Sequence, residues 1–174
     1  MANAMPDALI LLAATTAGFF DLRWKRIPNW LVLATILFSL TWHGAVGGLS
    51  GLWMSVAGLL VGTAILFPFF LLRGMGAGDV KFFGALAAAV TYKYVFTVLF
   101  FSAIIAGTMA LLRIIWEKAV IVTLLRLFDL FKWFGSGNLK PHPVMSLANT
   151  SALAVPFGVS IAIATWIFIF FGSR

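Results

Sequence analysis

The amino-acid sequence predicts an all-α membrane protein, built as a bundle of about six transmembrane helices. Hydrophobic residues make up 63% of the 174 positions, and charged residues make up only 10%. The mean hydropathy is +1.09. Soluble domains are about half apolar and about one quarter charged, so this composition excludes a soluble globular protein and a disordered chain. One span takes roughly 20 apolar residues, so residues 1–174 are expected to form a single integral-membrane domain.

Six apolar segments follow one another along the chain, and two of them are short for a spanning helix. The fourth reads FFGALAAAV, and its small residues permit close helix approach, which predicts a place at the centre of the bundle. Gly58 and Gly62 form a GxxxG pair on the third, which predicts tight packing there too. The expected spans are residues 8–20 (continuing toward Asp21), 29–42, 49–72, 79–91, 94–116 and 152–171.

The basic residues predict the orientation. With the N-terminus outside, all 12 Lys and Arg residues except Lys93 and Arg174 fall on the cytoplasmic side. Cytoplasmic loops accumulate basic residues, so we expect both termini outside. This distribution also explains the net charge of +7 without a nucleic-acid partner.

Residues 117–134 fit neither a clean span nor a soluble loop. Arg126 and Asp129 stand among Leu, Phe and Trp, which predicts an interfacial cytoplasmic helix. A seventh span is the alternative, but the two charges would then be costly if they faced lipid.

The scarcity of reactive side chains excludes several chemistries. Cysteine is absent, so disulfides, a cysteine nucleophile and a thiolate zinc site are excluded. His43 is expected in an outer loop and His142 in a Pro-His-Pro loop, which disfavours serine hydrolysis. No metal and no cofactor are predicted.

Asp21 and Asp79 stand out among the acids because each lies at the cytoplasmic end of an apolar helix. An ionisable residue at such a place indicates function. The structural alternatives are an i, i+4 ion pair of Asp21 with Lys25 and a helix N-cap at Asp79. The other acids have simpler explanations in solvent or in neighbouring basic residues: Asp7, Glu117 and Asp129.

The segment RGMGAGDVK surrounds Asp79 with alternating glycines at 74, 76 and 78. Glycine permits irregular backbone, which at membrane depth occurs only against protein or a wet cavity. We therefore expect Asp79 to project into a cavity. Two carboxylates facing one cavity push their pKa values apart, so that one activates water and the other polarises a carbonyl, as in aspartic proteases.

Three sequence blocks resemble those of the type IV prepilin peptidases. GMGAGDVKFFGA contains a GxGD motif, and FFDLRWKRIPNW at residues 19–30 resembles that family's block of an Asp followed by basic residues and Ile-Pro-Asn. VPFGVSIA at residues 155–162 resembles its late Pro-Tyr-Gly block, with Phe157 replacing Tyr. The resemblance implies that Asp21 and Asp79 are the catalytic pair. It assigns supporting roles to Gly76, Gly78, Lys81, Pro28, Asn29, Pro156 and Gly158.

The resemblance implies an intramembrane aspartic endopeptidase of the bacterial inner membrane that removes prepilin leaders at the cytoplasmic face. Its partners would be a prepilin-like substrate and the lipid bilayer. The chain lacks the cysteine-containing segment of bifunctional members, so it resembles the minimal Flp, tight-adherence type, and N-methylation is not expected. A transporter, a non-catalytic assembly protein and an archaellin-processing or presenilin-like peptidase are the alternatives. Oligomeric state does not follow from the sequence.

Overall fold

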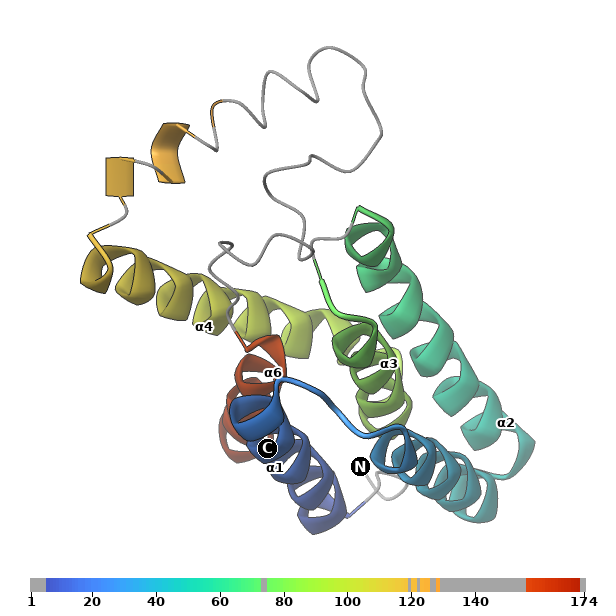
Figure 1. The fold of residues 1–174 in the computed structure, drawn as a ribbon. Coiled ribbons are helices and arrows are strands. Elements are labelled where there is room, and N and C mark those ends of the chain that lie inside the picture. The colour runs from blue at the N-terminus through green and yellow to red at the C-terminus, as the bar shows by residue number, and fades with distance from the viewer. Residues whose placement is uncertain are drawn as a thin grey trace.

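The computed structural model describes residues 6–72, 75–118, 120, 121, 123–125, 128 and 156–172. Over these residues the chain is helical and contains no strand, as the composition predicts. Figure 1 shows the helices as one bundle, in which α6 packs along α1 and α4 while α3 packs along α2. The elements are α1 (Asp7–Trp24), α2 (Asn29–Leu71), α3 (Ala77–Val90), α4 (Val95–Trp116), α6 (Phe157–Ile167) and the π-helical turn η1 (Phe168–Gly172).

Helix α2 contains two of the predicted spans, joined at Gly48. The backbone of Gly48 is left-handed, with φ 58° and ψ −148°, and the two arms of α2 diverge from this point (Figure 1). The reversal is so tight that a Cβ on Gly51 would overlap the carbonyl oxygen of His43. Glycine is the residue that adopts such a backbone without a steric penalty.

The expected outer loop at His43 is wrong. His43 lies inside α2 with only 2% of its surface exposed, and its Nδ1 is 2.8 Å from the carbonyl oxygen of Ser39. An apolar environment favours backbone groups that are paired within a helix, so the helix continues up to Gly48 rather than opening earlier.

Helix α3 lies at the centre of the bundle, as its small residues predict. Residues 82–90 are all buried, and a Cβ on Gly62 of α2 would lie 2.5 Å from the Cβ of Ala87. The Ser55 hydroxyl donates a hydrogen bond of 2.9 Å to the carbonyl oxygen of Ala88. The predicted tight packing at Gly58 and Gly62 is therefore confirmed.

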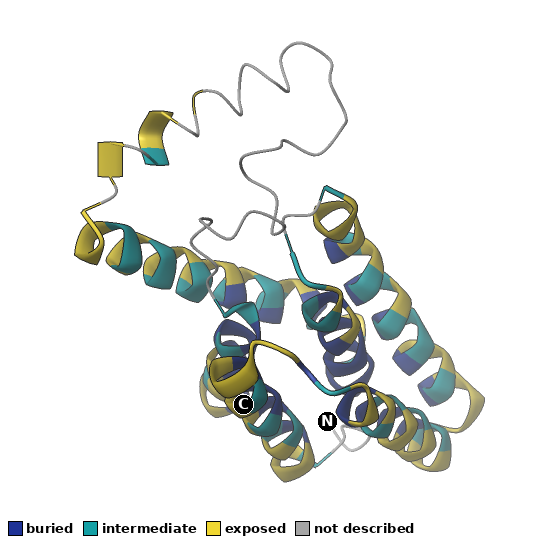
Figure 2. Ribbon diagram, viewed as in Figure 1, coloured by how far each residue is buried: buried dark blue, intermediate teal, exposed yellow. Residues whose placement is uncertain are grey.

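Exposed residues line the outer faces of the helices (yellow in Figure 2), and many of them are large and apolar. Helices α2 and α4 are long and apolar enough to cross a membrane, and residues 157–171 form a shorter apolar helix. These features support a helical membrane protein, while six spans and outward termini stay predictions.

Of residues 117–134, those described at 120, 121, 123–125 and 128 are helical. Arg126 and Asp129 lie outside the described residues, so the interfacial helix also stays a prediction.

Candidate active site

Asp21 and Asp79 come from different helices and lie at the same end of the bundle. Asp21 is in the last turn of α1, and Asp79 is in the first turn of α3. The two carboxylates are close enough for their charges to interact. The connection between α1 and α2 packs against the start of α3. Ile27 of this connection is buried, and a Cβ on Gly78 would lie 3.5 Å from the Ile27 backbone nitrogen.

The Asp21 side chain is held by the start of helix α6. Only 6% of Asp21 is exposed. The backbone N–H of Gly158 donates a hydrogen bond of 2.8 Å to its Oδ2, and the backbone N–H of Val159 also donates to the carboxylate. Lys25 acts on Asp21 through its charge, but it ends α1 in a left-handed conformation with φ 50°. The main partner of Asp21 is therefore a helix N-terminus rather than the predicted lysine.

Asp79 is the third residue of α3, so the interpretation of Asp79 as the N-cap is wrong. The N-cap is Gly76, because the helix begins at Ala77. The Asp79 carboxylate turns back to accept a hydrogen bond from the Gly76 backbone, which is half of a capping box. Gly76 has an extended backbone, with φ −72° and ψ 143°. Its lack of a side chain matters because a Cβ would lie 3.2 Å from Oδ2 of Asp79.

Among the other residues of the predicted site, two prolines cap helices and two polar residues are exposed. Pro28 and Pro156 are the N-caps of α2 and α6, where no backbone donor is needed for the helix. Asn29 and Lys81 are exposed. Gly74 lies outside the described residues. The sequence identified Gly158 through a resemblance, but its contact with Asp21 was missed, because 137 residues separate the two along the chain.

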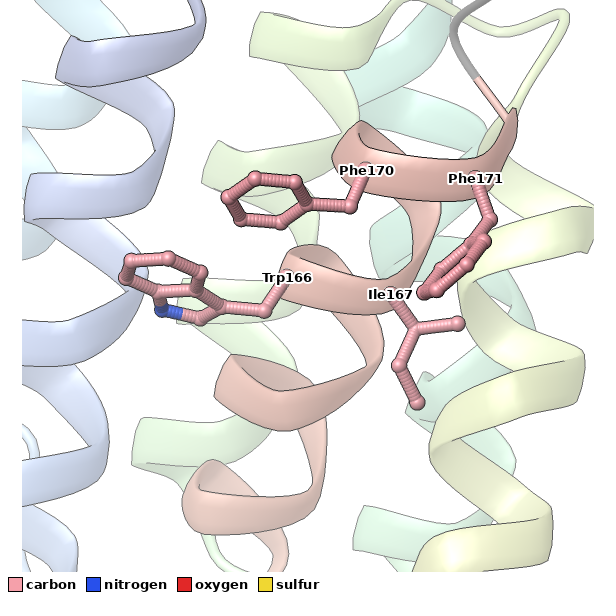
Figure 3. Close-up of a pocket in the computed structure, with 4 residues that line it drawn as sticks. All are labelled: Trp166, Ile167, Phe170 and Phe171. Carbon is pink, nitrogen blue, oxygen red and sulfur yellow. The ribbon is translucent and has the colours of Figure 1, made fainter.

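A shallow apolar pocket lies at the other end of α6, lined by Trp166, Ile167, Phe170 and Phe171 (Figure 3). The rings of Trp166 and Phe170 stack with their centroids 5.5 Å apart, and Trp166 donates a hydrogen bond of 2.9 Å to the hydroxyl of Thr15. The pocket begins about two turns beyond Gly158 and has no ionisable lining residue. It is therefore separate from the aspartate pair. No cluster of three or more possible metal ligands occurs among the residues that the structure describes.

Residues 8–111 match the type IV leader peptidase family, and this region contains both aspartates. The chain belongs to the type IV leader peptidase family. A relative from Xanthomonas campestris pathovar campestris, described as a prepilin leader peptidase/N-methyltransferase, is 28% identical over 164 residues. The alignment covers 88% of this chain and 45% of that relative, so this chain spans less than half of the relative's length. No solved structure matches the chain.

Proposed function

We propose that this chain is an aspartic endopeptidase that removes the leader from type IV prepilin-like proteins, with Asp21 and Asp79 as its catalytic pair. The observation that carries the proposal is that these two carboxylates lie at one end of the bundle, near enough for their charges to interact, in a chain of the leader peptidase family. Both acids belong to helices with little other charge, and Asp21 is buried.

The proposed chemistry needs one proton on the pair. Two carboxylates repel each other when both are ionised, so a single shared proton stabilises them. The ionised member accepts a proton from water as that water attacks the scissile carbonyl carbon. The protonated member donates to the carbonyl oxygen, and a proton then passes to the leaving amine as the peptide bond breaks.

We place the reaction at the cytoplasmic face of the bacterial inner membrane. Arg23, Lys25 and Arg26 are exposed where α1 joins α2, next to Asp21 in the chain. Basic residues favour the cytoplasmic side, so the same end of the bundle would meet a substrate whose leader is cytoplasmic and whose following helix lies in the bilayer. We further propose an Flp-type prepilin as the substrate and leader removal without N-methylation, because the 174 residues contain no cysteine.

Co-expression with a tagged Flp-type prepilin tests the proposal, with cleavage followed by gel shift and mass spectrometry. We expect wild type to cleave and Asp21→Asn and Asp79→Asn to lose cleavage while still accumulating as folded protein. Asp7→Asn is the matched control, because Asp7 is exposed in the first turn of α1 and should keep activity. The processed N-terminus should lack the mass of an added methyl group.

Two outcomes would contradict the proposal. Cleavage by folded Asp21→Asn or Asp79→Asn would exclude the pair as the catalytic groups and would favour the transport or assembly alternatives. A wild-type protein that leaves several prepilins uncut, although it is folded, would exclude leader peptidase activity.

A further inference from the structure

Asp21 occupies a position where its own helix disfavours a carboxylate. It lies in the last turn of α1, and the C-terminal end of a helix carries partial negative charge on its unpaired carbonyl groups. The N-terminal end of α6 offsets this. Its first-turn N–H groups, at Gly158 and Val159, donate to the Asp21 carboxylate, and an α-helix N-terminus favours a negative group.

The contact depends on a glycine at position 158. A Cβ there would lie 2.8 Å from Oδ2, 2.9 Å from Cβ and 3.0 Å from Cγ of Asp21. These distances are shorter than normal carbon contacts, so a side chain at 158 would displace the carboxylate. Gly18, one turn before Asp21, allows the same close approach of α1 to α6, since a Cβ there would lie 2.9 Å from the Cβ of Ala162.

We propose that Gly158 is a positioning residue for the catalytic pair: its backbone N–H, together with that of Val159, holds the Asp21 carboxylate at the end of the bundle where Asp79 also lies. This inference rests on the proposed peptidase function. The first turn of α6 thus aligns a group that α1 carries, without itself touching the reacting atoms. A displacement of about 1 Å of a catalytic group costs on the order of 100-fold in rate.

Gly158→Ala is the direct test, measured as kcat and KM with purified protein and prepilin in detergent. We expect kcat to fall by roughly 10- to 100-fold, with little change in KM, because the methyl group moves Asp21. Gly18→Ala is the matched control. It adds the same methyl group to the same α1–α6 interface, but against Ala162 and not against the carboxylate, so its kcat should fall much less than that of Gly158→Ala.

A second pair of variants covers the case in which Gly158→Ala does not fold. Val159→Pro removes one N–H donor in the first helical turn, where proline is tolerated, whereas Val159→Ala keeps that donor. We expect Val159→Pro to have a kcat roughly 10-fold below that of Val159→Ala.

The outcomes separate this inference from the proposed function. Equal losses of kcat in Gly158→Ala and Gly18→Ala would overturn it, because the effect would then be one of general packing. Near-wild-type kcat in Gly158→Ala, or equal kcat in the two Val159 variants, would also overturn it. In each of these cases, loss of cleavage in Asp21→Asn would leave the peptidase function intact.

Discussion

The packing of α2 against α3 leaves no room for a methyl group at Gly58. A Cβ at this position would overlap the carbonyl oxygen of Ala87, and it would lie 2.9 Å from the Ala87 carbonyl carbon and 3.2 Å from the Tyr92 backbone nitrogen. These are backbone atoms, which cannot rotate away as a side chain can. Relief therefore requires that α2 and α3 separate.

Two opposing effects determine how much Gly58→Ala changes the free energy of unfolding. Alanine is favoured over glycine in a helix interior by about 1 kcal/mol, whereas overpacking costs about 1–3 kcal/mol. We expect a net loss of up to about 2 kcal/mol in the free energy of unfolding, which corresponds to a fall in Tm of up to roughly 8 °C for a protein of this size. Because α3 carries Asp79, the cleavage rate should fall as well.

Gly107→Ala is the control for this prediction. Gly107 is in the middle of α4, and a Cβ there would meet nothing within 4 Å. The same substitution should therefore raise the free energy of unfolding, by up to about 1 kcal/mol. Thermal unfolding of both purified variants in one detergent measures the difference, and a Gly58→Ala protein as stable as Gly107→Ala would refute the packing argument.

Three further predictions concern the chemistry and the surface. The cleavage rate should be bell-shaped in pH, because activity needs one proton on the Asp21–Asp79 pair: low pH protonates both carboxylates and high pH ionises both. A rate that stays constant from acidic to alkaline pH would contradict this. Treatment with EDTA should leave the rate unchanged, and a loss that added metal restores would contradict the mechanism. The ion pair of Arg113 with Glu117, at 2.9 Å, is partly exposed, so a double-mutant cycle on unfolding should give a coupling of at most about 1 kcal/mol.

Local features of the sequence predict much of the fold. Apolar composition and six apolar segments along the chain predict helices, and the small residues of 82–90 predict the central position of α3. The Arg113–Glu117 pair also follows from its spacing of four residues. These predictions are confirmed because they depend on a residue's own chemistry or on neighbours within one or two helical turns.

Predictions failed where a boundary depends on more than the nearest residues. His43 was expected in an outer loop because it falls between the expected spans 29–42 and 49–72, but the helix continues to Gly48 and buries the imidazole. The structural alternative for Asp79 was an N-cap, a position that aspartate favours, but Gly76 is the N-cap and Asp79 is in the third helical position. In both cases the local sequence allowed the helix to begin or end at more than one residue, and the packing of the bundle selected one of these boundaries.

The residue types along the chain thus set the membrane environment, the helices and the presence of two isolated carboxylates. They do not set how closely α1 approaches α6. The hydrogen bond from Gly158 to Asp21 spans 137 positions, and it exists because Gly18 and Gly158 let the two helices come together. A hydrogen bond depends on tenths of an ångström, and that separation results from the packing of the whole bundle.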